Sequence, residues 1–323
     1  MVARNRICNL IIDSCCDLPA DLVASYDVDL VEFTFAMSDG VHLDDLGVSM
    51  SHKEFYDLMR KGEEPKTSLV PYHIYEDRFE RAAASGVPTV YLGFTAALSG
   101  SLDVARQAAA DVLSRHPNAE LYVVDTKLPS AAEGLLVMEA MRQLDRGLSA
   151  REVVAWAEEA RYYVNGFFTL LNLDALQKGG RIPDMAAVVG AKLDIKPILT
   201  YDIDGRLTFY GVARGRKKAL KQLLQIYLER RGDDYLDTVI VASADANKEQ
   251  NAFVEQVLKF SGANLSVWQT QIGPVIGSHV GPGMMAIVFW GPDRRKRVSL
   301  TDRIANAVSH RNDQKDEGSS YDI

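Results

Sequence analysis

The sequence predicts an α/β protein with two domains: an N-terminal domain built on a mostly parallel sheet, and a C-terminal α+β domain. The chain has 323 residues, which is enough for two domains of ordinary size, and its 47% hydrophobic content supports a core in each. The first half alternates short buried strands with helices, a rhythm typical of parallel sheets. The second half is richer in strands and carries a hairpin signal, so a different kind of sheet is expected there.

Short apolar runs in the first half have the length and composition of strands that are buried on both faces. Helices are expected to begin at the capping boxes Ser51–Glu54 and Ser149–Glu152 and to cover Ser99–Leu113 and Ala131–Leu144. Because a parallel sheet opens its crevice at the carboxyl ends of its strands, binding loops are expected there. The strands are expected at Ile7–Ile12, Leu30–Ala36, Thr89–Phe94 and Leu121–Val124.

The second half has an α+β pattern in which Asp204–Gly205 is a hairpin signal between two strands. Helices are expected at Lys217–Arg230 and Lys248–Phe260. The strands are expected at Phe167–Leu171, Ile198–Tyr201, Leu207–Val212, Thr238–Ala242, Leu265–Gln269 and Met285–Trp290.

The change of pattern near Tyr162–Gly166 predicts an N-terminal domain over residues 1–163 and a C-terminal domain over residues 164–309. Residues 310–323 form a polar tail that is predicted to be disordered. No apolar run approaches the ~20 residues of a membrane span, and the N-terminus is too short in apolar residues for a signal peptide. A cytoplasmic location is therefore expected.

Composition narrows the class of function. The formal net charge of −8 argues against general binding of nucleic acid. The three cysteines, including the neighbours Cys15 and Cys16, do not make a disulfide framework, and buried thiols are expected. The scattered histidines and cysteines lack the spacing of metal ligands, so neither a metal site nor a cofactor is predicted.

The end of the first predicted strand carries polar residues where a parallel sheet would open. Asp13 and Ser14 follow the apolar run directly, and Asp17 stands two residues before Pro19. Asp17 is explained as the cap of a helix that starts near Pro19. That explanation leaves Asp13 and Ser14 as candidates for a supporting role at a site.

Small hydroxyl residues stand at two further positions between elements. Thr67 and Ser68 follow a turn and precede a predicted helix, and on local grounds they are caps. Ser99, Gly100 and Ser101 open the helix after the strand that ends at Phe94. Backbone N–H groups at a helix start attract anions, so this second position is the stronger candidate.

Two glycine-rich segments of the second half each carry one basic residue. Arg181 follows a double glycine, and its guanidinium can hold a carboxylate or phosphate with two hydrogen bonds. An ion pair with Asp184 is an equally good local explanation. His279 lies within GSHVGPG at residues 277–283, predicted to be a loop whose glycines let the backbone approach a ligand. We expect both residues to face an anion.

The common catalytic motifs are absent from the sequence. It contains no GxSxG elbow, Walker A loop, GxGxxG fingerprint or HExxH. A serine-dependent acyl hydrolase or transferase using Ser99 and His279 is conceivable, but it needs an aspartate to orient the histidine, and the sequence does not place one. A non-catalytic binding protein is therefore favoured.

Six segments, in order, resemble motifs of the DegV family, the fatty-acid-binding proteins also called FakB, and the match runs over nearly the whole chain, from Ile11 to Trp290. IIDSCCDLP resembles the opening xTDSxADLP, KTSLVP resembles TSxPS, and GFTAALSGSLDVARQAA resembles SSxLSGTYxxA. VVDTKLPSAAEGLLVMEA resembles VIDSxxxSxGxGxLVxxA, and LQKGGRIPDMAAVVGAKLDIKPIL is very close to LxxGGRIxxxxxxxGxxLxIKPIL. GSHVGPG matches HxGPG. Together the six are specific to this family.

The resemblance implies a two-domain α/β fold with a long-chain fatty acid buried between the domains. It implies that Thr67, Ser99 and the amide of Gly100 bind the carboxylate, and that Arg181 and His279 handle the phosphorylated head group. It also implies a partner, a separate fatty acid kinase that makes acyl phosphate for phospholipid synthesis. Lipid exchange would allow transient contact with a membrane. A lipid-sensing module without a kinase partner would use the same pocket.

The chain departs from the family pattern around the carboxylate site. Thr95 and Ala96 stand where the family has two serines, and Ser101 stands where it has threonine. The TSLVP segment has its proline one place later than the family. The expected carboxylate anchors are kept, while the supporting shell differs. That shell is expected to consist of Asp13, Ser14, Ser68, Thr95 and Ser101.

Overall fold

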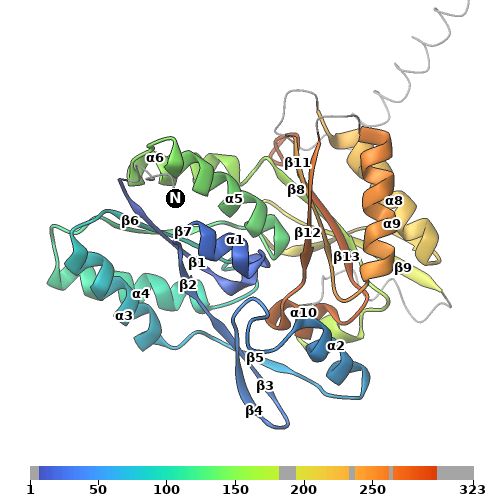
Figure 1. The fold of residues 1–323 in the computed structure, drawn as a ribbon, viewed down its shortest axis with the longest axis horizontal. Coiled ribbons are helices and arrows are strands. Elements are labelled where there is room, and N and C mark those ends of the chain that lie inside the picture. Colours follow the sequence, from blue (N-terminus) through green and yellow to red (C-terminus); the bar gives the residue numbers. More distant parts are fainter. Residues whose placement is uncertain (1–6, 182–193, 233–236, 262–264, 297–323) are drawn as a thin grey trace, which may run out of the picture.

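The structure is a computed structural model that describes residues 7–181, 194–232, 237–261 and 265–296. Within these ranges the strands form three sheets of four, six and three strands. The four-stranded sheet comes from the first half of the chain and the six-stranded sheet from the second half, and helices pack around and between them (Figure 1). This confirms the predicted α/β class. The tail at residues 310–323 lies outside the described residues.

The four-stranded sheet is parallel throughout, as the sequence predicts. β1 lies inside it and pairs with β2 on one side and β6 on the other. The chain therefore leaves β1 first in one direction and later in the other, which opens a crevice at the carboxyl ends of these strands. The strands are β1 (Asn9–Asp13), β2 (Asp29–Val31), β6 (Thr89–Gly93) and β7 (Leu121–Asp125), in the order β2-β1-β6-β7.

The strand predicted at Leu30–Ala36 is wrong in one respect, because it is two strands in two sheets. The chain turns at Glu32, and the Phe33 amide donates a hydrogen bond to Ser14 Oγ. β3 then pairs in antiparallel fashion with β4 and β5, forming the small sheet β4-β3-β5. Its strands are β3 (Phe33–Met37), β4 (Gly40–Asp44) and β5 (Lys66–Ser68).

The six-stranded sheet is mixed, with parallel pairing between β11 and β12 and antiparallel pairing elsewhere. Its hairpin turns at Gly205, which has a φ of +86° and so favours glycine, as the Asp204–Gly205 signal predicts. The strands are β8 (Val164–Thr169), β9 (Ile195–Tyr201), β10 (Leu207–Arg214), β11 (Thr238–Ser243), β12 (Ser266–Gln271) and β13 (Met285–Trp290), in the order β10-β9-β8-β13-β11-β12.

Helix α5 joins the two large sheets. Nearly all of its residues are buried, because it packs both on the segment after β1 and on β8, β11 and β13 of the six-stranded sheet. The capping box at Ser149–Glu152 is confirmed in both directions. The helices are α1 (Ala20–Ser25), α2 (His52–Arg60), α3 (Tyr72–Ser85), α4 (Ser101–Arg115), α5 (Ala131–Asp145), α6 (Ala150–Ala160), α7 (Asp174–Lys178), α8 (Arg216–Arg230), α9 (Asn247–Ser261) and α10 (Pro274–Val280).

The prediction that Asp17 caps a helix is wrong. The residue that precedes α1 is Pro19, whose side chain makes no capping bond. Asp17 instead ends the short 3-10 helix Ser14–Cys16 in a left-handed conformation, with a φ of 51°. Its buried carboxylate reaches Gly273 and Ser130, both distant in the sequence. Asp17, which is predicted to make a local capping bond, therefore makes hydrogen bonds to residues that are distant in the sequence.

Candidate functional site

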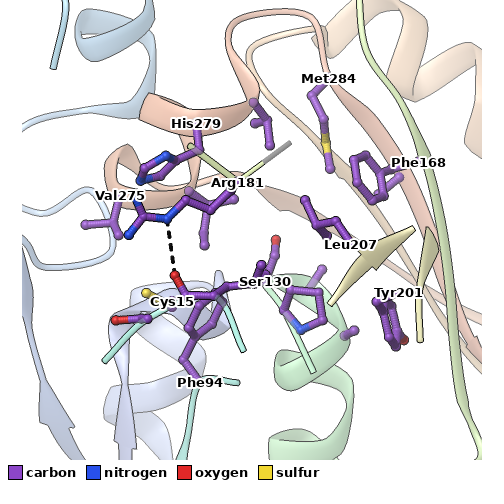
Figure 2. Close-up of a pocket in the computed structure, with 18 of the residues that line it drawn as sticks. Cys15, Phe94, Ser130, Phe168, Arg181, Tyr201, Leu207, Val275, His279 and Met284 are labelled. Carbon is purple, nitrogen blue, oxygen red and sulfur yellow. Dashed lines mark hydrogen bonds between the residues drawn. The ribbon is translucent and has the colours of Figure 1, made fainter. Parts of the chain in front are cut away.

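A cavity of about 1050 Å³, including its open mouth, lies where the carboxyl ends of the parallel strands meet the six-stranded sheet. Cys15 follows β1, Phe94 follows β6, and Pro129 follows β7, and all three line it. The cavity thus lies at the carboxyl ends of the parallel strands, where the sequence analysis expects binding loops. The opposite wall comes from the strands of the six-stranded sheet, including Phe168 and Tyr201 (Figure 2).

Most of the cavity wall is apolar, and polar side chains gather at one end. Figure 2 shows His279 and Arg181 on one side of the cavity, with Leu207 and Tyr201 on the other. Tyr201 packs where Gly166 has no side chain, since a Cβ there would lie 2.7 Å from the ring. Large aromatic and aliphatic groups thus form a surface suited to an apolar chain.

The structure brings together side chains that the sequence separates widely. Thr67 on β5, Ser99 before α4, Arg181 after α7 and His279 on α10 all line the polar end, together with Ser68. Four segments that are separate in the sequence therefore contribute to one region. This is the grouping that the family resemblance implies.

Ser101 explains how the segments of Thr67 and Ser99 come together. Its buried hydroxyl accepts a hydrogen bond from the Val70 amide at 3.1 Å, which ties the chain after β5 to the start of α4. It also contacts Ser99 Oγ at 3.1 Å, and Ser99 Oγ accepts from the Ser101 amide at 3.2 Å. Gly100 between them is exposed and precedes α4 as its N-cap.

His279 lies in the last turn of α10, so the prediction of a glycine-rich loop is wrong for the first half of GSHVGPG. The glycines act after the histidine, where Gly281 ends the helix with a φ of +72°. Gly283, with a φ of +83°, leaves room for Leu171, because a Cβ would lie 2.6 Å from that side chain. A helix fixes the imidazole more firmly than a loop would.

The imidazole of His279 is held between Thr67 and the double glycine. Nε2 lies 2.8 Å from Thr67 Oγ1, while Nδ1 is buried and has no partner among the described residues. A Cβ at Gly179 would lie only 2.2 Å from Nδ1, so glycine is needed there. Burial, and then the positive charge of Arg181, lower the pKa of His279 from 6.5 to about 4. The imidazole is therefore neutral at pH 7.

Arg181 is aimed by the turn that ends α7. Gly180 has a φ of +70°, and the Arg181 amide donates to the Leu176 carbonyl, which closes the helix and turns the chain back. The guanidinium donates from Nε to the Leu98 carbonyl at 3.2 Å and from Nη1 to the Gly179 carbonyl at 2.6 Å. The alternative partner Asp184 lies outside the described residues.

The residues expected in a supporting role hold the walls of the cavity. Asp13 accepts hydrogen bonds from the amides of Phe94 at 2.8 Å and Cys15 at 3.0 Å. Burial raises the pKa of Asp13 to about 6. Thr95 accepts from the Ala97 amide and, at 3.5 Å, lies within reach of the Gly205 carbonyl at the β9–β10 turn. Ser14 holds Phe33, another wall residue, as described above.

Sequence reasoning missed most of the wall. Cys15 and Ser130 line the cavity and stand within family motifs, but those motifs do not single them out as ligand contacts. Phe168, Tyr201 and Leu207 belong to no motif and come from strands β8, β9 and β10, whose apolar pattern predicts burial only. In the structure Ser130 stands out, because its φ of 57° is unusual for serine and its hydroxyl donates to Asp17.

The geometry bears on the hydrolase alternative. A serine nucleophile needs a histidine within hydrogen-bond reach and a carboxylate to orient that histidine. Here the Nε2 atom of His279 pairs with Thr67, and Ser99 pairs with Ser101. The Ser99–His279 pair is not formed in this structure. In the described ranges, no group of three or more His, Cys, Asp or Glu side chains could hold a metal ion, and no helix is long and apolar enough to cross a membrane.

The fold and the site define a class of protein: an α/β protein that encloses an apolar cavity with one polar end. The chain belongs to the DegV family. The profile described as "Uncharacterised protein, DegV family" matches residues 8–291. A DegV domain-containing protein of Clostridium perfringens is 32% identical over 280 residues, covering 86% of this chain and 96% of that protein.

Solved structures of relatives share the fold. A stearic acid-binding protein from Eubacterium ventriosum superposes with a TM-score of 0.79 at 28% identity, covering 90% of this chain and all of that chain. A DegV family protein from Thermus thermophilus, described by its fatty acid binding, gives a TM-score of 0.74 at 26% identity, covering 89% and 100% of the two chains. Both likenesses span the two large sheets described above.

Proposed function

We propose that this protein binds one long-chain fatty acid in the cavity and presents its carboxylate to a separate fatty acid kinase in the cytoplasm. The observation that carries the proposal is the polarity of the cavity, whose lining is mostly apolar while Thr67, Ser99, Arg181 and His279 are grouped together. An amphiphile with a long apolar chain and one anionic head matches this distribution. The relatives described as binding fatty acids support the proposal.

The apolar wall accounts for affinity. Each buried methylene contributes about 0.8 kcal/mol, so a long acyl chain supplies ample binding free energy without any chemical step. The carboxylate is then assigned to the hydroxyls of Thr67 and Ser99, with the Gly100 amide beside them. Hydrogen bonds from hydroxyls and from a helix start stabilise such an anion. Because Thr67 can donate only one proton, its bond to a carboxylate requires that His279 Nε2–H donates to Thr67 Oγ1.

Arg181 and His279 are assigned to the head group when it gains phosphate. A phosphate carries more negative charge than a carboxylate, so a guanidinium and an imidazole stabilise the phosphorylated state more than the free acid. Added negative charge would also raise the pKa of His279 from about 4 and favour its protonated form. Arg181 and His279 would thus bind the acyl phosphate more strongly than the free fatty acid.

The lipid assignment is tested by mass spectrometry of protein purified from its own cells. The expected result is one long-chain fatty acid per protein molecule in the denatured extract. A nucleotide or a sugar phosphate as the sole bound molecule would overturn it. A fatty acid found without any kinase that accepts the loaded protein would leave a lipid-sensing module as the function.

The transfer step is tested with Arg181→Ala and His279→Ala. Each variant should keep its fatty acid but form less acyl phosphate with the cognate kinase. Thermal melts must show that both variants are folded. Variants that lose the lipid yet phosphorylate the remainder at the normal rate would show that these roles are wrongly assigned.

A further inference from the structure

The start of α10 is held by two buried carboxylates from the first half of the chain. Asp17 Oδ1 accepts a hydrogen bond from the Gly273 amide at 2.7 Å, and Asp44 Oδ2 accepts one from the Val275 amide at 3.1 Å. Pro274 between them has no N–H. The family motifs of the site include neither Asp44 nor any residue of the Gly273–Val275 segment. We call Asp17 and Asp44 the α10 anchor.

Further contacts fix how α10 lies against the small sheet and α2, where Figure 1 shows it. The Tyr56 hydroxyl donates to the Ile272 carbonyl at 2.9 Å. A Cβ at Gly277 would lie 2.5 Å from that hydroxyl and 2.9 Å from the Phe55 ring, so the helix backbone sits directly on α2. The helix therefore has little room to slide.

The anchor is close to the polar end of the cavity along α10. The helix has seven residues, and Val275 and His279 are four positions apart, about one turn. Both residues line the cavity. A displacement of the start of the helix would therefore also displace the imidazole. It would change the 2.8 Å distance between His279 Nε2 and Thr67 Oγ1.

We propose that Asp17 and Asp44 are positioning residues that set His279 against Thr67 through α10. Their effect on head-group handling rests on the proposed function. Their effect on the position of the imidazole does not, because the hydrogen bonds to Gly273 and Val275 are made within the chain itself.

The two carboxylates of the α10 anchor lie close together in a buried acidic cluster. A Cβ at Gly273 would lie 2.9 Å from Asp17 Oδ1 and 3.0 Å from Asp44 Oδ2, so both carboxylates converge on one glycine. Burial raises the pKa of Asp44 to about 7 and that of Asp17 well above its usual range. The negative charges of Asp44 and Asp13 raise the pKa of Asp17 further, and those of Asp45 and Asp13 raise the pKa of Asp44. A protonated carboxyl still accepts through its carbonyl oxygen. The other titratable groups that act on this pair or feel its charge are Asp13, Asp45, Tyr56, Cys15, Cys16 and Glu133.

The test measures the pKa of His279 by NMR in the empty full-length protein. Asp17→Ala and Asp44→Ala should each raise it by at least one unit from about 4 toward 6.5, because a displaced imidazole gains solvent. Because their pKa values are raised, Asp17 and Asp44 are mostly protonated in the pH range where His279 titrates, so a rise in its pKa reports a changed position of the imidazole rather than a lost charge. Asp17→Asn and Asp44→Asn keep an acceptor oxygen and should restore the low value.

Glu133→Gln is the matched control. Glu133 is as buried as the anchor and lies in the same acidic cluster, but it makes no bond to α10. Its change should leave the pKa of His279 where it is. An unchanged value in the folded alanine variants, or an equal rise in Glu133→Gln, would overturn the proposal.

Hydrogen exchange of the wild-type protein decides the question without any variant. The amides of Gly273 and Val275 should exchange as slowly as those of the six-stranded sheet, and exchange as fast as in exposed loops would overturn the anchor. The expected His279 shifts in the alanine variants, together with a wild type that binds no fatty acid, would refute the proposed function alone. Normal loading with no His279 shift in the folded variants would refute the anchor alone.

Discussion

The two ends of the cavity are built in opposite ways. At the polar end, Thr67, Ser99, Arg181 and His279 come from four short or irregular segments that hydrogen bonds draw together. At the apolar end, the walls are regular strands of the six-stranded sheet and the start of α5. The difference separates two properties of the proposed function, the affinity for an acyl chain and the handling of its head group. Under that proposal the strands provide the area for the acyl chain, and the short segments of the polar end hold its head group.

The largest effect is expected from filling the apolar end. Ala286 on β13 is buried and lines the cavity, so Ala286→Phe should occupy the space of several methylenes. At about 0.8 kcal/mol for each methylene, the loss is about 3 kcal/mol, or a 100-fold weaker binding of an 18-carbon acid. Isothermal titration with 18- and 10-carbon acids measures it.

The short acid is the control for that variant. A 10-carbon chain that reaches only part of the cavity should bind to Ala286→Phe about as well as to the wild type. Equal weakening of both acids would mean that the substitution disturbs the polar end, and the separation of the two ends would fail.

The next effect concerns the polar end alone. Ser99→Ala should weaken fatty acid binding by about 1.5–3 kcal/mol, because one hydrogen bond to a charged group is lost. A fatty alcohol of equal length should be affected less. Ser114→Ala, on the exposed face of α4, is the matched control. An acyl-enzyme at Ser99 with an activated ester would instead favour the hydrolase alternative.

The two ends also differ in how far the sequence predicts them. The polar residues stand in motifs at strand ends and beside glycines. Their neighbours in the sequence are therefore enough to suggest that they face an anion. The wall residue Tyr201 is set by the glycine at position 166, which is distant in sequence, and no local pattern reveals that contact. Asp17 shows the same limit, because a local cap was predicted and long-range bonds to Gly273 and Ser130 were found.

The fold was more predictable than the site. The alternation of short apolar runs with helical patterns predicts the parallel strands, and Asp204–Gly205 predicts the hairpin, because both signals depend only on residues near each other in the sequence. The break at Glu32 was missed because the apolar run continues through it, while the chain changes sheet there. Likewise, the glycines of GSHVGPG predict a loop, yet the tight fit of Gly277 on Tyr56 explains one of them within a helix.

A smaller effect is expected on the titration of His279. Loading with a fatty acid should raise its pKa by about one unit from about 4, because the carboxylate favours the protonated imidazole. Without ligand, His279 has a pKa of about 4 in the folded protein and 6.5 in the unfolded chain, so as pH falls the unfolded chain is protonated at a higher pH than the folded protein. The His279 contribution therefore lowers the free energy of unfolding as pH falls from 6.5 to about 4, and loading should narrow that interval.

NMR of labelled histidine measures this shift. A fatty alcohol of the same length is the control, because it fills the apolar end without bringing a charge. An equal shift with acid and alcohol would mean that the carboxylate does not lie near His279, and the proposed orientation of the ligand would be reversed.

The smallest effect on binding is expected for Ser101→Ala. This variant tests whether fatty acid binding depends on the hydrogen bonds that hold the Thr67 and Ser99 segments together. The Ser101 hydroxyl lies behind Ser99 and binds the Val70 amide, so its loss should loosen the link between the Thr67 and Ser99 segments. Binding of the fatty acid should weaken by about 1 kcal/mol, less than for Ser99→Ala, while the unpaired buried amide should cost about 1–3 kcal/mol of stability. Titration and thermal melts on the same protein separate the two. Weakening equal to that of Ser99→Ala, with no loss of stability, would show that Ser101 itself contacts the head group.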